Sequence, residues 1–224
     1  MLDFSSNIFK FTQDILKSND IDIVGLKNNV TYVEKDGTRV AIIGINNVII
    51  GNQYSYEEAG MYIYNLESIK GTIKEARDQA DSVIVMTHYG RENVHEVTDV
   101  MRWFSRELID SGADMVLGGH SLGIYPVEEY NGKLIVYSMG YLIHDTDSEI
   151  GKKSAIFDIN IDKNGTVKSL SIKPTIILNK KEVKLYKDVD EKGLNSFLKQ
   201  LKNGSSLSSY NIDEKKGSIV LSKN

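Results

Sequence analysis

Hydrophobic and polar positions follow two different periods along the first 120 residues. Residues 38–46 (TRVAIIGIN), 81–88 (DSVIVMTH) and 113–120 (ADMVLGGH) are short apolar runs, rich in branched side chains, of the kind that form buried strands. Residues 66–80 and 97–113 instead place apolar side chains three and four positions apart, which predicts a helix between successive strands. This alternation predicts a parallel sheet with right-handed crossovers.

The predicted helices carry apolar stripes that should face the core. The stripes are Ile69, Ile73 and Ala76; Val100, Phe104, Leu108 and Ile109; and, near the amino terminus, Phe4, Ile8, Phe11 and Ile15. Trp103 is expected in the core or half-buried, because its ring is large and apolar.

The pattern changes after His120. The dipeptides Asn131-Gly132 and Asn164-Gly165 each separate two strand-like segments, which is typical of β-hairpins. Around the second dipeptide the segments IFDINI and VKSLSI alternate apolar and polar residues, so each predicts a half-buried strand. The second half of the chain is therefore expected to be antiparallel.

The carboxyl-terminal region is more polar than the rest. From Asn179 it is rich in Lys, Asp, Ser and Asn, with one predicted helix over residues 191–202 and a short strand over residues 217–222. We therefore predict a domain over residues 1–178 and a polar extension with a helix and a short strand over residues 179–224.

Composition narrows the classes of function. The chain has 224 residues, a net charge of −4 and no cysteine, which excludes disulfides, thiolate metal ligands and cysteine nucleophiles. The negative charge argues against nucleic acid as a partner. The sequence has no apolar run long enough to span a membrane and no signal peptide at its start. A start in mid-motif without a leader is what a piece of a longer protein would show.

Two histidines end predicted neighbouring strands. His88 closes one apolar run and His120 closes the next, and Glu92 follows four residues after His88. Functional groups gather at the carboxyl ends of parallel strands, and neutral imidazole is a good ligand for zinc, manganese or iron. The alternative is that each histidine only ends its strand and hydrogen-bonds locally. Arg91 could hold a carboxylate or phosphate through two hydrogen bonds, or face solvent.

Three segments together resemble a known family. They are MTHYGRE (residues 86–92), LIDSGADMVLGGHS (108–121) and PVEEYNGKLIVYSMGYLIHD (126–145), and they are similar to the CapA-like capsule synthesis proteins of the bacterial poly-γ-glutamate system. The resemblance implies a calcineurin-like metallophosphoesterase fold. The expected fold class is therefore α/β (α+β): a partial β-sandwich flanked by helices, parallel in its first half and antiparallel in its second.

The resemblance also implies roles for individual residues. His88 and His120 match metal ligands of the family, and Glu92 matches the glutamate that would orient the site or act as a base. Leu122 stands where the family has a second ligand histidine. The family's upstream Asp, N-L-E and N-N-H motifs would lie before Met1. The expected cofactor is therefore a weakly bound divalent metal (Mn, Fe or Zn).

Other positions are expected to have structural roles. His95 is expected in an exposed loop, and His144 in a packing or surface role where the family has an aromatic residue. Tyr141 replaces the asparagine of the family's S-L-G-N motif.

The predicted function is capsule, poly-γ-glutamate or other cell-envelope polymer biosynthesis by a truncated or degenerate metallophosphoesterase-like domain. The alternative is an active metal-dependent phosphoesterase when the chain is joined to an upstream half. The expected partners are a polyanionic polymer or the synthesis machinery, without nucleic acid. A membrane is expected only through an upstream segment, and the expected location is extracytoplasmic or at the cell envelope.

Overall fold

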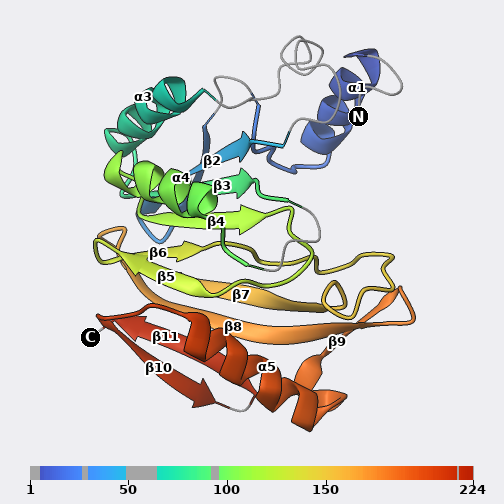
Figure 1. Cartoon of the computed structure of the whole chain (residues 1–224). Coiled ribbons are helices and arrows are strands. Elements are labelled where there is room, and N and C mark those ends of the chain that lie inside the picture. Colours follow the sequence, from blue (N-terminus) through green and yellow to red (C-terminus); the bar gives the residue numbers. More distant parts are fainter. Residues whose placement is uncertain (1–5, 27–29, 49–64, 92–95, 216, 224) are drawn as a thin grey trace.

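The protein forms two β-sheets with helices packed around them (Figure 1). The structure is a computed structural model, and it describes residues 6–26, 30–48, 65–91, 96–215 and 217–223. Figure 1 shows α3 and α4 on the outer side of the first sheet and α5 beside the second.

The first sheet has six strands in the order β1-β2-β3-β4-β6-β5. Its strands are β1 (Thr31–Lys35), β2 (Thr38–Asn46), β3 (Ser82–His88), β4 (Met115–Gly119), β5 (Val127–Tyr130) and β6 (Lys133–Val136). Strands β2, β3, β4 and β6 are parallel, whereas β1 and β5 pair antiparallel at the edges. The parallel arrangement predicted before His120 is confirmed for β2 to β4. It also continues into β6, because the hairpin at Asn131-Gly132 returns the chain in the direction of β4.

The second sheet is antiparallel throughout, as predicted. Its strands are β7 (Lys153–Ile161), β8 (Val167–Leu178), β9 (Glu182–Leu185), β10 (Tyr210–Lys215) and β11 (Ser218–Lys223). The order is β10-β11-β8-β7, and β9 also pairs with β8. The hairpin at Asn164-Gly165 and the last strand are confirmed, whereas the apolar pattern did not indicate β9 or β10. The boundary proposed at residue 178 stays a prediction, and the strands on both sides of it share one sheet.

Helices begin where side chains can accept hydrogen bonds from free backbone N–H groups. The helices are α1 (Ser6–Ser18), α3 (Leu66–Arg77), α4 (Asp99–Asp110), the short 3-10 helix η1 (Tyr186–Asp188) and α5 (Glu191–Gly204). Asn65, Thr98 and Asp190 precede α3, α4 and α5, and each side chain accepts from an N–H of the first turn.

The predicted helix faces are partly correct. Ile69, Ile73 and Ala76 of α3 are buried, as expected. In α4 the prediction for Val100 is wrong: its side chain is 66% exposed, and Met101 takes the core position in its place. Phe104, Leu108 and Ile109 are buried as expected, so the error concerns only the first turn of α4.

Two further expectations concern large apolar side chains. Trp103 is 50% exposed, so the expectation that it lies in the core is wrong. The helix expected near the amino terminus is confirmed as α1, but Ile8, Phe11 and Ile15 are exposed and Phe9 is buried instead. Phe4 lies outside the described residues.

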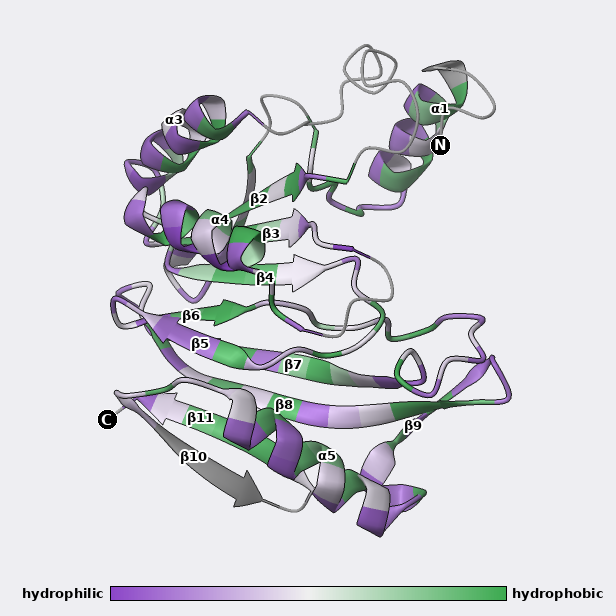
Figure 2. Ribbon diagram, in the orientation of Figure 1, coloured by the Kyte–Doolittle hydropathy of each residue, from purple (hydrophilic) through white to green (hydrophobic). Residues whose placement is uncertain are grey.

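The core is divided by the first sheet. One cluster lies between this sheet and helices α3 and α4, and includes Val83, Val85, Phe104 and Leu108. The other joins the opposite face of the sheet to the second sheet and α5. Figure 2 shows the apolar colour on β6, alternating apolar and polar colours on β7 and β8, and apolar and polar sides on α3, α4 and α5, as alternation and helical spacing require.

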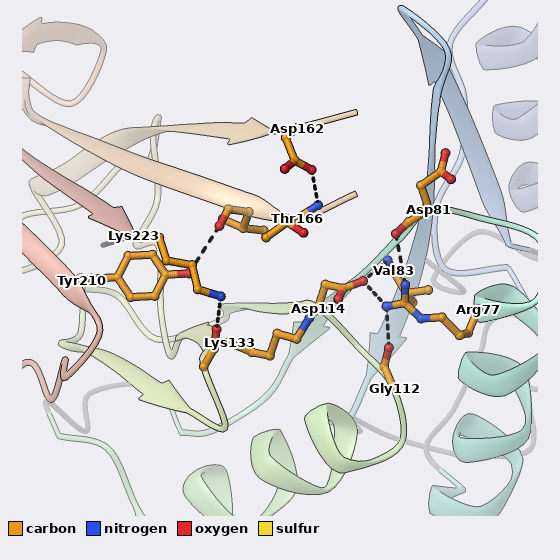
Figure 3. Close-up of polar contacts among 12 residues, drawn as sticks. Arg77, Asp81, Val83, Gly112, Asp114, Lys133, Asp162, Thr166, Tyr210 and Lys223 are labelled. Carbon is orange, nitrogen blue, oxygen red and sulfur yellow. Dashed lines mark hydrogen bonds and ion pairs between the residues drawn. The ribbon is translucent and has the colours of Figure 1, made fainter. Parts of the chain in front are cut away.

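A polar network closes the amino ends of the central strands (Figure 3). Asp114, directly before β4, is buried, and its carboxylate accepts hydrogen bonds from Arg77, Lys133 and the Val83 backbone N–H. Arg77 also donates to the Gly112 carbonyl oxygen at 2.9 Å. Each partner is supplied by a different element, so the network ties α3, β3, β4 and β6 together.

Candidate functional site

The two strand-end histidines meet at the carboxyl edge of the first sheet. His88 is the last residue of β3, and Gly119, which pairs with it across the sheet, directly precedes His120. The ring centroids of His88 and His120 are 4.6 Å apart, and their planes are inclined by 58°. The expected proximity of the two imidazoles is therefore confirmed, whereas their role as metal ligands stays a prediction.

His120 is held in an uncommon backbone conformation. Its φ is 85°, in the left-handed region that side chains other than glycine rarely adopt. The side chain is only 7% exposed, and the Tyr141 hydroxyl donates a hydrogen bond to the His120 carbonyl oxygen at 3.0 Å. Backbone strain that surrounding contacts maintain is typical of functional sites.

A cavity of about 420 Å³ opens beside His88 at the ends of β2, β3 and β4. Its lining residues are Val24, Gly25, Gly44, Ile45, Asn46, Met86, Thr87, His88, Leu117, Gly119 and Met139. No charged side chain of the described part of the chain lines it, so its polar side chains are those of Asn46, Thr87 and His88. The cavity therefore suits a neutral or apolar group better than a phosphate in direct contact with the protein.

Asn46 and Thr87 belong to this edge although sequence reasoning did not select them. Asn46 ends β2 and pairs with His88 across the sheet, and its side-chain oxygen accepts from the Val48 N–H at 3.0 Å. Thr87 is buried, and its hydroxyl makes no hydrogen bond within the described residues. The available signal was the position of Asn46, since it ends an apolar run just as His88 does.

The described residues fit one divalent ion better than two. Among residues 6–26, 30–48, 65–91, 96–215 and 217–223, no group of three or more His, Asp or Glu side chains is arranged to hold a metal. Two imidazoles leave several coordination positions to water, and a two-metal centre also needs bridging oxygen ligands. Leu122, two residues after His120, has no donor atom. Glu92 and His95 lie outside the described residues.

Arg91 lines a different cavity. This cavity, of about 440 Å³, lies between the end of β3 and the start of α4, and Asn47, Thr98 and Val100 also line it. It shares no lining residue with the cavity beside His88. The structure therefore does not bring Arg91 into the cavity of the histidine pair.

Tyr141 connects His120 to a third histidine. The ring of His144 stacks on Tyr141, with centroids 4.8 Å apart and an interplanar angle of 18°. This contact agrees with the packing role expected for His144. Tyr141 itself belongs to the site through its hydrogen bond to His120, and the indication in the sequence was its place in the S-M-G-Y segment.

The second buried carboxylate, Glu128, is occupied by structural contacts. Arg102 and Arg106 of α4 donate to it at 2.9 and 2.8 Å, and the Tyr137 hydroxyl also donates to it. Burial, followed by the hydrogen bond to Glu128, raises the pKa of Tyr137 above its ordinary value. This cluster anchors α4 to β5 and β6, and it leaves no free carboxylate oxygen for chemistry.

Comparison with known proteins places this geometry in context. The family model "Bacterial capsule synthesis protein PGA_cap" matches residues 1–146. The PGA biosynthesis protein CapA of Bacillus subtilis (strain 168) is 29% identical over 174 residues, covering 74% of this chain and 46% of that protein. The capsule biosynthesis protein CapA of Bacillus anthracis is 28% identical over 177 residues, covering 74% and 43%. The chain thus spans less than half the length of these curated relatives.

Solved structures support the fold class. A Staphylococcus aureus protein assigned as a 5'-nucleotidase, solved in complex with alpha-ketoglutarate, superposes with a TM-score of 0.52 at 17% identity. The match covers 88% of this chain and 41% of that chain. At this identity the likeness concerns the fold alone, and it supports the predicted arrangement of two sheets with flanking helices.

Proposed function

Because this chain belongs to the bacterial capsule synthesis protein family PGA_cap, we propose that it is a metallophosphoesterase-like domain of capsule or poly-γ-glutamate biosynthesis with a partial metal site. The observation that carries this proposal is the approach of His88 and His120 at the carboxyl edge of the sheet, with ring centroids 4.6 Å apart. Ligand sites of open α/β sheets lie at this edge.

We propose a role for each of these residues at the carboxyl edge of the first sheet. His88 and His120 hold one manganese, iron or zinc ion through ring nitrogens, for which neutral imidazole is well suited. Such an ion, when bound, polarises a phosphoryl oxygen and acidifies water. Asn46 offers an amide beside the ion, and Tyr141 keeps His120 in place through its backbone carbonyl.

The ion is held weakly, and this chain by itself does not hydrolyse phosphoesters. Two nitrogen donors give a site that exchanges its ion with solvent, in contrast to a closed site with four protein ligands. The hydrocarbon side chain at Leu122 removes a further donor from the loop of His120.

Two other functions remain as alternatives. In the first, the chain is part of an active metal-dependent phosphoesterase once an upstream half supplies more ligands. In that form Glu92 would act as base and Arg91 would hold the phosphate. In the second, the chain is a non-catalytic member that binds a polyanionic polymer or the synthesis machinery. The cavity beside His88 does not favour a polymer there, because no described cationic side chain lines it.

The proposed place of action is the cell envelope, where capsule biosynthesis occurs. Among the described residues no helix is long and apolar enough to cross a membrane. The proposal involves no nucleic acid, in keeping with the net charge of −4.

Metal analysis combined with a hydrolysis assay tests the proposal. Purified chain is equilibrated with manganese or zinc, and its metal content is measured by mass spectrometry, together with hydrolysis of bis(p-nitrophenyl) phosphate. We expect at most one ion per chain and no hydrolysis above the metal-only background. His88→Ala and His120→Ala should each remove the ion.

His144→Ala is the matched control, because it removes an imidazole that stacks on Tyr141 and leaves the His88–His120 pair intact. Equal metal content in all three variants would reject the histidine site. Two tightly held ions per wild-type chain together with hydrolysis would reject the partial site in favour of an active enzyme. In such an active form Glu92→Gln should lower kcat.

A further inference from the structure

A separate cavity of about 340 Å³ lies where three segments of the chain meet. The segment after β4 contributes Ile124 and Pro126, the start of β7 contributes Lys153 with the preceding Ile150, and α5 contributes Phe197, Gln200 and Leu201. None of these residues lines the cavities beside His88 or Arg91. The cavity is therefore distinct from the proposed metal site.

The walls of this cavity are fixed by close packing. A Cβ atom on Gly123 would lie 2.6 Å from Ile150, and one on Gly204 would lie 2.6 Å from Pro126. Glycine is thus required at both positions for the walls to approach this closely. The end of α5 is held by the Ser205 hydroxyl, which accepts from the Val127 N–H at 3.0 Å. These contacts indicate a preformed hollow rather than a chance gap between elements.

The charge of the cavity comes from one lysine. Lys153 is half-buried and makes no ion pair within the described part of the chain. The neighbouring Lys152, by contrast, pairs with Glu149 at 2.7 Å. The hydrogen bond from Lys152 holds the pKa of Glu149 below its ordinary value, and the nearby charge of Lys153 makes a smaller contribution in the same direction. An ammonium group without an ion-pair partner at the wall of an apolar hollow is suited to an anion.

We propose that this cavity binds a small amphipathic anion, namely a carboxylate carried on a short apolar chain. The carboxylate lies against the Lys153 ammonium and the Gln200 amide, and the apolar chain contacts Ile124, Phe197 and Leu201. A volume of 340 Å³ equals about eleven water molecules, which leaves room for a ligand of about ten non-hydrogen atoms. Its mixture of apolar walls and few polar groups is typical of small-molecule sites.

Titration with three probes of matched size or charge tests the ligand class. Hexanoate carries both groups, 1-hexanol lacks the charge, and acetate lacks the chain. Amide signals of the full chain are followed by NMR, and we expect shifts at Ile124, Lys153 and Leu201. Hexanoate should bind about fivefold or more tightly than either other probe, because it alone satisfies both the cation and the apolar wall.

Adjacent lysines provide a matched pair of variants. Lys153→Gln should weaken hexanoate binding about fivefold and leave 1-hexanol unchanged, since only the charged contact is lost. Lys152→Gln removes the same charge from the residue that already pairs with Glu149, and it should leave both probes unchanged. Gln200→Trp, at an exposed position of α5, should block the entrance and reduce binding of every probe.

The proposal is overturned by any of three results. These are no hexanoate-dependent shift at these amides at millimolar concentration, equal binding of hexanoate and 1-hexanol, or equal weakening by the two lysine variants. Thermal unfolding of each variant checks that it is folded. If Lys153→Gln is unstable, unchanged hexanoate binding by Gln200→Trp would overturn the proposal, and reduced binding would support it.

Discussion

The two ends of the same central strands differ in how completely their polar groups are satisfied. At the amino ends, the buried carboxylate of Asp114 accepts from Arg77, Lys133 and a backbone N–H. At the carboxyl ends, Thr87 and His88 line a cavity, and the buried Thr87 hydroxyl has no hydrogen-bond partner within the described residues. A fully hydrogen-bonded network stabilises the fold, whereas an unpaired hydroxyl that lines a cavity is available to a ligand.

The largest expected effect is a loss of stability when the hydrogen-bond network at the amino ends of the strands is broken. Asp114→Ala should lower the free energy of unfolding by about 2–4 kcal/mol, because Arg77 and Lys133 lose their counter-ion; the partial exposure of both cations limits the loss. Urea denaturation measures this change. His88→Ala, at the exposed end of β3, should stay within about 0.5 kcal/mol of wild type. Equal losses from the two substitutions would remove the distinction between the ends.

The next largest effect concerns metal affinity at the carboxyl ends of the strands, where His88 and His120 lie. Leu122→His should tighten binding of a single ion about tenfold or more, since it adds an imidazole two residues from His120, and tenfold corresponds to about 1.4 kcal/mol. It should not produce phosphodiesterase activity, because bridging oxygen ligands are still needed for two metals. Isothermal titration with zinc and the chromogenic assay measure the two outcomes. Unchanged affinity would place residue 122 outside the site.

Backbone strain at His120 gives a smaller effect. Both His120→Gly and His120→Ala remove the imidazole, but only glycine tolerates the φ of 85° without cost. The glycine variant should therefore be about 1 kcal/mol more stable than the alanine variant, although neither should bind the ion. Chemical denaturation of the two variants side by side measures the difference. Greater stability of the alanine variant would show that this conformation stores no strain.

The smallest effect concerns a carboxylate that belongs to neither strand end. Burial raises the pKa of Glu129, but hydrogen bonds from Ser209 and Ser208 outweigh it and hold the pKa below the ordinary value of 4.5. A depressed folded-state pKa gives stability that is present above pH 4.5 and is lost as the pH falls through the folded-state value.

Glu129→Gln should therefore cost about 0.5–1 kcal/mol at pH 7 and less at pH 3, since the wild type loses its charge-assisted hydrogen bonds as Glu129 is protonated, whereas the variant lacks them at every pH. Denaturation at the two pH values measures the difference. A constant or growing difference at low pH would contradict the assigned direction of the pKa shift.

Much of the fold was predictable because its signals are local. The apolar runs of β2, β3 and β4, the spacing in α3, and the Asn-Gly dipeptides each specify a backbone conformation over a few residues. The sequence pattern did not predict strands β1, β9 and β10, because they are short or polar and depend on pairing with a neighbouring strand. Val100 was misplaced because Val100 and Met101 lie four and three residues before Phe104, and helical spacing alone does not decide which of two apolar neighbours faces the core.

The sequence by itself determined that two histidines end neighbouring strands, and parallel topology then requires those ends to share one edge. Only the tertiary structure decided which other residues join them. It placed Asn46 and Tyr141 beside the pair and Arg91 in another cavity. Among the described residues, it also paired Lys152 but not Lys153 with a carboxylate. These choices depend on contacts between residues distant in the chain, whose side chains meet only after sheets and helices have packed.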